Sequence, residues 1–162
     1  MKVAVGDQAP DITVSAHNGQ QICLSDYRGE KVVLFFYPKD GTPVCTKEAC
    51  AFRDTYEQFV EAGAVVIGVS ADSEKKHQSF AAKHRLPFLL VSDKDGSLRK
   101  GFAVPKTMGF LPGRVTYVID KEGVVRLVFN DQSLLHSPVC HVEEALKRLK
   151  GTGNNIARAG VI

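Results

Sequence analysis

Two cysteines stand close together in the stretch "YPKDGTPVCTKEACAFRD" (37–54), and the first occupies a position that favours chemistry. Thr42 followed by Pro43 is a typical helix start, with the threonine at the N-cap and the proline in the first turn. Cys45 then falls near the third helical position, where unpaired backbone N–H groups and the positive end of the helix dipole favour an anion. A cysteine at such a position carries more thiolate at neutral pH, and the thiolate is the nucleophilic form. The Thr42 hydroxyl can point into the same space.

Cys50 follows five positions later, a spacing that is neither the C-x-x-C of a redox dithiol nor that of a metal knuckle. On a helix this separation gives roughly 7.5 Å of rise and ~140° of rotation, so the two Cα atoms lie roughly 8–9 Å apart. A disulfide requires Cα atoms within about 7 Å. The two cysteines can therefore bond only if the first turns of the helix unwind, and taken alone Cys50 could equally be a small buried apolar residue.

A second helix start in the same chain shows how much of this pattern is ordinary capping. The stretch "TPVCTKE" (42–48) has a counterpart in "SPVCHVE" (137–143), with hydroxyl, proline, valine, cysteine and glutamate in the same register. Capping alone would produce both, so a plain capped helix is the alternative to a reactive Cys45. Pro38 and Cys50 flank the first cysteine, whereas nothing equivalent flanks Cys140.

The composition fits one soluble domain. The chain has 162 residues, of which 44% are hydrophobic and 24% charged, with a net charge of +3 and no run of like charge. Nothing here favours binding to nucleic acid or to an anionic membrane, and no segment reaches the ~20 apolar residues of a membrane span. The start has no apolar leader, so we expect a cytoplasmic protein. We predict a single domain over 1–150 and a flexible tail over 151–162, which is rich in glycine and asparagine.

Short apolar runs alternate with amphipathic segments, which predicts a three-layer α/β domain with a central mixed sheet and helices on both faces. Strands are expected at 31–37, 64–71, 88–93, 114–120 and 124–129, and helices at 43–61, 73–85, 96–102 and 138–150. The last two strands are joined by "KEG", a hairpin signal. The helix with Cys45 begins past the carboxyl end of a buried strand, where open α/β sheets usually carry their sites.

The residues around Cys45 resemble a known family. The run "PKDGTPVC" (38–45) matches the P-x-x-x-T-x-x-C signature of peroxiredoxins. "GDQAPDITV" (6–14) is similar to the family's opening, and "GRVTYVID" (113–120) to its R-x-T-F-V-I-D strand. "CTKEACAFRD" (45–54) looks like the Q-type subfamily, also called bacterioferritin comigratory proteins. The resemblance covers roughly residues 3–150, with Val44 standing where Q-type members often carry glycine.

This resemblance implies a thioredoxin-like fold and thiol-dependent reduction of hydrogen peroxide and organic hydroperoxides, as part of antioxidant defence. Carried over by position, Cys45 is the peroxidatic cysteine and Cys50 the intramolecular resolving cysteine. Thr42 and Arg114 hold the peroxide and the thiolate, and Pro38 shields the thiolate. Glu48 stands where the family has an acid that positions the arginine. The implied cycle forms a sulfenic acid and then a 45–50 disulfide.

The resemblance also implies which partners the chain has. Thioredoxin or a similar dithiol protein would reset the disulfide, and no metal, haem or flavin is needed. Because the resolving cysteine is intramolecular, we expect a monomer. Two other readings stay open at this point: a thioredoxin-like disulfide carrier, and a zinc or partner-binding module built on Cys45, Cys50, Cys140 and His141.

The remaining chemistry-bearing side chains are expected to be structural. Cys23 lies in a predicted strand and is expected to fill the core, while Cys140 has no second cysteine near it in sequence. The histidines are expected in loops or on exposed helix faces; they are His17, His77, His84, His136 and His141.

Overall fold

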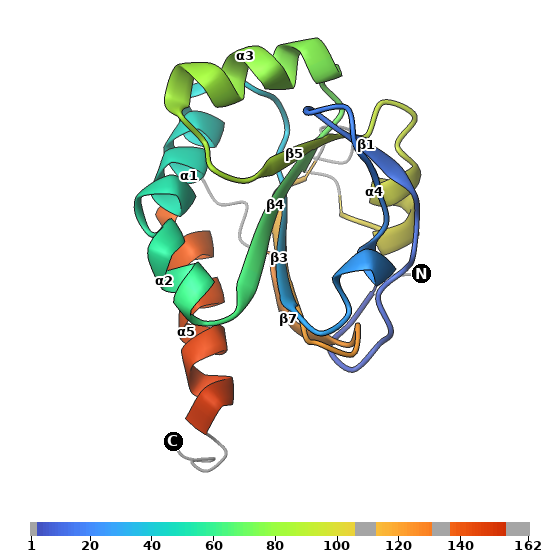
Figure 1. Cartoon of the computed structure of the whole chain (residues 1–162), viewed down its shortest axis with the longest axis vertical. Coiled ribbons are helices and arrows are strands. Elements are labelled where there is room, and N and C mark those ends of the chain that lie inside the picture. Colours follow the sequence, from blue (N-terminus) through green and yellow to red (C-terminus); the bar gives the residue numbers. More distant parts are fainter. Residues whose placement is uncertain (1–2, 106–112, 131–136, 155–162) are drawn as a thin grey trace.

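A seven-stranded mixed sheet runs through the centre of the molecule (Figure 1). The structure is a computed structural model that describes residues 3–105, 113–130 and 137–154. The strands are β1 (Val14–Ala16), β2 (Gln21–Ile22), β3 (Lys31–Phe36), β4 (Ala64–Ser70), β5 (Leu89–Ser92), β6 (Val115–Ile119) and β7 (Val125–Phe129). Their order is β2-β1-β5-β4-β3-β6-β7, with β3 parallel to β4 and β4 parallel to β5, and the other pairs antiparallel. The predicted mixed sheet is confirmed.

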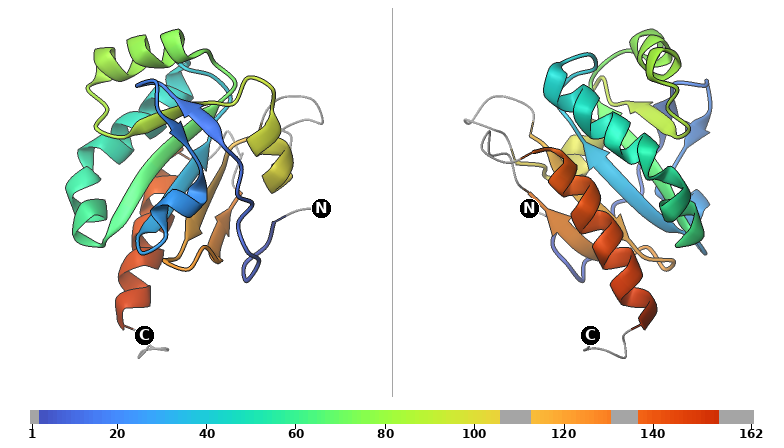
Figure 2. Two further views of the ribbon diagram at one scale, coloured as in Figure 1. Left: turned by 45° about the vertical axis from the view of Figure 1, so that its right-hand side comes forward. Right: turned by 90° about the vertical axis from the view of Figure 1, so that its left-hand side faces the viewer.

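Helices cover both faces of this sheet. They are η1 (Leu24–Tyr27), α1 (Pro43–Asp54), α2 (Tyr56–Glu61), α3 (Glu74–His84), α4 (Ser97–Phe102) and α5 (Val139–Asn154). Figure 2 shows α1, α2 and α5 together on one face, with α4 on the other. None of the helices in the described part of the chain has the length and apolar character needed to cross a membrane.

The residues of strand β3 contribute side chains to two hydrophobic cores, one on each face of the sheet. Side chains alternate along a strand, so Val33, Phe35 and Tyr37 join the core under α1, α2, α3 and α5. Val32, Leu34 and Phe36 join the second core, under η1 and α4. Burial on both faces is why this strand is apolar throughout and does not alternate with polar residues.

The predicted helix over 43–61 is wrong in one respect, because it is two helices. Thr55 leaves helical geometry, with φ −107° and ψ 9°, and its hydroxyl donates to the Ala51 carbonyl at 2.8 Å. A threonine whose hydroxyl bonds back to the preceding turn competes with the regular backbone ladder. The break leaves both Cys45 and Cys50 within α1.

Differences elsewhere are small. Strand β1 was not predicted, and the strand expected around Cys23 is confirmed only as β2. Cys23 was expected in that strand and in the core, and this expectation is wrong: it is the half-buried N-cap of η1. Helix α5 runs through Asn154, past the predicted end at residue 150, and residues 155–162 of the predicted tail lie outside the described residues. The "KEG" hairpin is confirmed, with Gly123 at φ +86°.

Candidate active site

Cys45 lies in the first turn of α1, directly beyond the carboxyl end of β3. Thr42 is the N-cap in extended geometry, Pro43 follows in the first turn, and the Thr46 amide donates to the Thr42 carbonyl at 2.9 Å. The side chain of Cys45 is 2% exposed. Backbone N–H groups of a first helical turn lack intrahelical acceptors, so the thiol sits where an anion is favoured.

Arg114 reaches this thiol from the neighbouring strand. It precedes β6, whose first residue, Val115, pairs with Phe36 at the end of β3. One guanidinium nitrogen, Nη2, donates to Cys45 Sγ at 3.3 Å, and the other, Nη1, donates to Glu48 Oε1 at 2.6 Å. Burial works against the charge on Arg114, but the attraction of Glu48 and then Cys45 raises its pKa above the ordinary value.

Glu48 is the fully buried partner of Arg114. It follows Cys45 by one helical turn, so both side chains lie on one face of α1. Burial raises the pKa of Glu48 to about 7, while the charge of Arg114 acts in the opposite direction. The second carboxylate oxygen, Oε2, makes no hydrogen bond in the structure. Its neighbour is His141 of α5, whose Nδ1 is 3.7 Å away.

His141 was expected on an exposed face, and that expectation is wrong: it is 1% exposed. Its Nδ1 and the Thr116 hydroxyl are 2.8 Å apart, and its ring meets Phe129 edge to face at 4.7 Å. The burial of His141 could not be recognised from the sequence, because a histidine next to a predicted helix cap is typical of a surface position. Cys45, Arg114 and Glu48 therefore lie in one connected group with His141 behind them.

Thr42 and Pro38 lie in the segment between β3 and Cys45. Both are half-buried. The Thr42 hydroxyl donates to the Lys39 carbonyl at 3.1 Å and does not cap the helix through its side chain. This hydroxyl therefore fixes the loop that carries Pro38.

Cys50 lies elsewhere on α1. It is half-buried, and its Sγ is 3.8 Å from Nδ1 of His84, at the end of α3. All four cysteines are free, and α1 is continuous from Pro43 to Asp54. The structure therefore holds Cys45 and Cys50 in one unbroken helix, at the separation that prevents a disulfide.

A buried polar group anchors the loop between β3 and α1. The Tyr37 hydroxyl donates to Asp40 Oδ1 at 2.5 Å, and His77 Nδ1 is 2.5 Å from Asp40 Oδ2. His77 Nε2 donates to the Val91 carbonyl at 2.9 Å, and the Asp40 amide donates to Asp72 at 2.7 Å. Burial raises the pKa of Tyr37 well above its ordinary value. His77 was expected to be exposed; it is fully buried, and that expectation is also wrong.

Arg99 of α4 links the two segments that bear Pro38 and Arg114. Its guanidinium donates to the Tyr37 carbonyl at 3.4 Å and to the Gly113 carbonyl at 3.2 Å, and it lies over the Phe36 ring. Arg99, Asp40 and His77 were not predicted from the sequence, because the contacts of Arg99 with Tyr37 and of His77 with Asp40 join residues far apart along the chain. The only sequence signal was the presence of charged or titratable residues in otherwise apolar surroundings.

The group of residues best placed to bind a metal ion differs from the cysteine and histidine set that the sequence suggested. Within the described residues, the one group of possible ligands is Asp40, Asp72 and His77, whose ligand atoms lie within 4.8 Å of one another. Both ring nitrogens of His77 already bind protein oxygens, so these residues form a hydrogen-bonded group of their own. In the same part of the chain, Cys45, Cys50, Cys140 and His141 do not converge on a metal-sized site.

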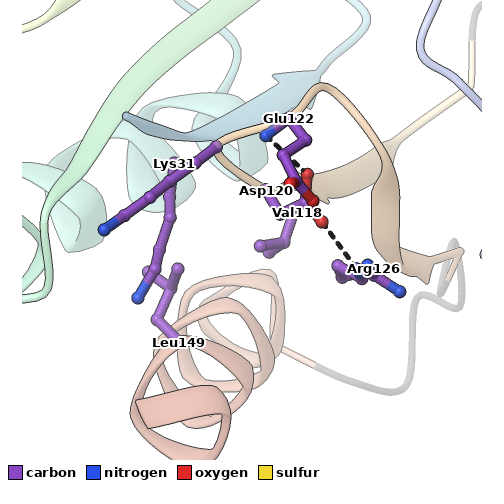
Figure 3. A pocket seen from close by; sticks show the side chains of 7 residues that line it. Lys31, Val118, Asp120, Glu122, Arg126 and Leu149 are labelled. Carbon is purple, nitrogen blue, oxygen red and sulfur yellow. Dashed lines mark hydrogen bonds and ion pairs between the residues drawn. The ribbon is translucent and has the colours of Figure 1, made fainter. Parts of the chain in front are cut away.

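A separate hollow of about 510 Å³ lies at the opposite end of β6, away from Cys45 (Figure 3). Its lining includes Lys31, Asp120 and Leu149, and Asp120 accepts from Arg126 at 2.8 Å. No cysteine is among its lining residues, and none of them belongs to the group around Cys45.

Comparison with known proteins agrees with this geometry. The AhpC/TSA family profile matches residues 5–128. Peroxiredoxin Q from Sedum lineare is 49% identical over 150 residues, covering 92% of this chain and 79% of the relative. The chain belongs to the AhpC/TSA family, in its peroxiredoxin Q group. Peroxiredoxin Q from Arabidopsis thaliana is 51% identical over 150 residues, covering 92% of this chain and 68% of the relative.

Solved structures of other peroxiredoxins have the same fold. Peroxidoxin BcpB from Mycobacterium tuberculosis superposes with a TM-score of 0.83 at 36% identity, covering 91% of this chain and 97% of that one. The bacterioferritin comigratory protein of Xanthomonas campestris gives 0.78 at 35% identity, covering 86% of this chain and 90% of that one. Membership in this family argues against the disulfide-carrier and zinc-module readings.

Proposed function

We propose that Cys45 is the residue with which this peroxiredoxin attacks its substrates, and that Cys50 resolves the product within the same chain. The substrates of this thiol peroxidase are hydrogen peroxide and organic hydroperoxides. The observation that carries the proposal is the contact of Arg114 with both Cys45 Sγ and Glu48 Oε1. The related Xanthomonas campestris protein is described as having alkyl peroxide reduction activity, which supports an organic substrate as well.

In the first step the Cys45 thiolate attacks one peroxide oxygen and the O–O bond breaks. The departing oxygen leaves as hydroxide or alkoxide and takes up a proton to become water or an alcohol. Cys45 is thereby oxidised to a sulfenic acid. Arg114 is already placed beside the sulfur, so it can stabilise negative charge on the thiolate and on the leaving oxygen without reorganising. The N–H groups of the first turn of α1 serve the same purpose, and Thr42 is the N-cap residue that precedes them.

In the second step the Cys50 thiolate attacks the Cys45 sulfenic sulfur. The S–S bond forms, the S–O bond breaks, and the hydroxyl leaves as hydroxide, which takes up a proton from solvent to become water. Helix α1 must open for this step, because the two cysteines lie in one unbroken helix. Helix ends open at lower free energy than helix centres, and Cys45 is in the first turn.

The partner and setting are part of the same proposal. A dithiol protein, thioredoxin or a similar one, would attack the 45–50 disulfide and return both thiols by exchange. A monomer suffices, since both cysteines belong to one chain. We also predict, from the sequence alone, that the protein is cytoplasmic and that it needs no cofactor.

Mass spectrometry after one equivalent of peroxide tests the resolving step. We expect the oxidised chain to lose two hydrogens and to yield a peptide pair joined through Cys45 and Cys50. Cys45→Ser should abolish peroxide consumption, and Cys50→Ser should complete one turnover and stop as the sulfenic acid. Cys140→Ser is the matched control and should cycle normally. A 45–140 bond, an intersubunit bond, or sustained thioredoxin-driven cycling of Cys50→Ser would overturn the scheme.

Hydrogen exchange tests the opening of α1. Amides of residues 43–52 should exchange much faster after oxidation, whereas those of α3 should change little. A helix α1 that stays protected in the disulfide form would contradict the unwinding.

A further inference from the structure

Cys50 has a titratable neighbour of its own, apart from the group around Cys45. Its Sγ and His84 Nδ1 are 3.8 Å apart, within the range of a hydrogen bond that involves sulfur. The contact joins α1 to the last residue of α3. Either the thiol donates to the ring nitrogen, or the ring N–H donates to the thiolate, so both protonation states of the pair have a favourable contact.

Two contacts hold His84 in place beside the thiol. Arg53, one helical turn after Cys50, donates through Nη1 to the His84 carbonyl at 2.8 Å. The Phe80 ring meets the imidazole edge to face at 5.0 Å. These contacts fix the backbone and limit rotation of the ring, so His84 is presented to Cys50 and is not a mobile surface histidine.

The surroundings of this pair are positively charged. Arg53, Lys83, His84 and Arg85 line an open hollow of about 510 Å³ at the junction of α1 and α3. Asp54 is the acidic group nearby, and it pairs with Arg53 at 2.9 Å. Solvent can reach the hollow, so a proton accepted by His84 has an exit to water.

We propose that His84 accepts the proton of the Cys50 thiol and so prepares Cys50 for the resolving step. This role rests on the proposed function, in which Cys50 attacks oxidised Cys45. The proton moves from Cys50 Sγ to His84 Nδ1, the resulting thiolate attacks the Cys45 sulfenic sulfur, and the departing hydroxide takes up a proton to leave as water. His84 releases its proton to solvent, and the net reaction consumes one thiol and one sulfenic acid and yields one disulfide and one water.

The proton transfer from Cys50 to His84 takes place before α1 opens. In the closed helix Cys50 contacts His84, whereas attack on Cys45 requires the helix to unwind. An ordinary thiol is only a few per cent ionised at neutral pH, so a base in contact with it can accelerate its attack by about tenfold. Peroxide reduction at Cys45 involves a different group of residues and should not depend on His84.

The test is a single-turnover experiment on the full chain at neutral pH. One equivalent of peroxide is added, samples are quenched over time with dimedone, and mass spectrometry counts sulfenic acid and 45–50 disulfide. We expect His84→Asn, which keeps a polar group near the thiol but is a poor base, to form sulfenic acid at the wild-type rate. Conversion to disulfide should be slower by about tenfold. The wild-type rate of conversion should return at a pH of about 9–10, where thiols ionise without help.

Two controls separate proton transfer from simple charge and from misfolding. Lys83→Gln removes a positive charge from the same hollow but leaves the imidazole, and should slow conversion by less than about twofold. In His84→Gly, added imidazole should restore part of the rate. Equal conversion rates for wild type and His84→Asn, or equal slowing by Lys83→Gln, would overturn the role of His84. A wild-type chain that forms no 45–50 disulfide would instead overturn the proposed function itself.

Discussion

His141 stands directly behind Glu48: its Nδ1 lies 3.7 Å from Glu48 Oε2, while Oε1 of the same carboxylate accepts from Arg114. The arginine that contacts Cys45 is thus held by a carboxylate that is itself buried against a histidine. The active site consequently depends on α5, the last helix of the fold, as well as on α1 and β6.

The first prediction concerns the protonation of Glu48. Burial raises its pKa from 4.5 to about 7, so the protonated form is favoured by folding. The stabilising effect of this group is complete below about pH 4.5 and is lost as the pH rises through about 7. It amounts to about 3 kcal/mol at most. Glu48→Gln should therefore remove a fall in the free energy of unfolding between pH 5 and 8, measured by urea denaturation.

A matched variant isolates that effect. Glu143 lies exposed on α5, so Glu143→Gln should leave the pH dependence as it is in the wild type. The comparison is sound only if Glu48→Gln folds, which is expected because the amide oxygen can still accept from Arg114. If wild type and Glu48→Gln lose the same stability between pH 5 and 8, the assignment to Glu48 fails.

The second prediction tests the contact between Thr116 and His141 by a double-mutant cycle. Thr116→Val and His141→Leu each leave a buried polar group without this partner, at 2.8 Å in the native protein, and should each cost about 1–3 kcal/mol. The double variant should cost less than the two together, with a coupling of about 1 kcal/mol. Thr116→Val combined with Val60→Ala, on exposed α2, should be additive. Additivity in both cycles would show that the contact contributes nothing to stability.

The third prediction concerns Asp40, which accepts from the Tyr37 hydroxyl and faces His77. Because the Val91 carbonyl can only accept, His77 Nε2 carries a proton, and the contact of Nδ1 with the Asp40 carboxylate requires a second proton between those two atoms. With an asparagine at 40 that second proton is not needed, because the side-chain amide supplies the donor. An asparagine at 40 can then accept from Tyr37 and donate to His77 Nδ1. Asp40→Asn should thus keep most of the stability, whereas Asp40→Ala should lose about 2–5 kcal/mol by leaving buried groups unpaired. Thermal and urea denaturation distinguish the two, and equal losses would refute this hydrogen-bond assignment.

The two Asp40 variants should also differ in peroxidase activity, with the larger loss in Asp40→Ala. Asp40 lies in the loop that carries Pro38 and Thr42, so Asp40→Ala should lower kcat/KM for peroxide more than Asp40→Asn. This follows because small displacements of positioning groups reduce rates strongly.

The sequence was sufficient for most of the fold, because its signals there were local. Continuous apolar runs marked β3 and β4, and "KEG" marked the hairpin between β6 and β7. Strand β1 was missed because it is short and partly polar, and its pairing with β5 depends on residues far along the chain. The strand expected around Cys23 is shorter than predicted and ends at Ile22. The end of α1 at Thr55 was missed because the apolar period continues through it.

The residues of the candidate site also fall into two groups: those that the sequence indicated and those that only the structure revealed. Helix-start chemistry identified Cys45, and the family resemblance pointed to Arg114 and Glu48. In the structure Arg114 contacts both Cys45 and Glu48. Nothing local could place His141 behind Glu48 or His77 beside Asp40, since these contacts join separate elements. The histidines were expected to be exposed because that is usual for the residue type, and burial with specific partners overrides that tendency.

The last prediction concerns Val44, which stands next to Cys45 and is 40% exposed. An apolar side chain at the rim of the site can contact the alkyl group of an organic hydroperoxide but gains nothing from hydrogen peroxide. Val44→Ala removes two carbons, so it should lower kcat/KM for a bulky alkyl hydroperoxide by about fourfold to fifteenfold, since each carbon buried by the substrate contributes ~0.8 kcal/mol. The value for hydrogen peroxide should stay within about twofold, since its oxygens interact with Arg114 and the helix start. Val60→Ala, at 54% exposure on α2, is the matched control and should alter neither substrate. Parallel losses for both peroxides in Val44→Ala would show that Val44 supports the helix start and makes no contact with the alkyl group.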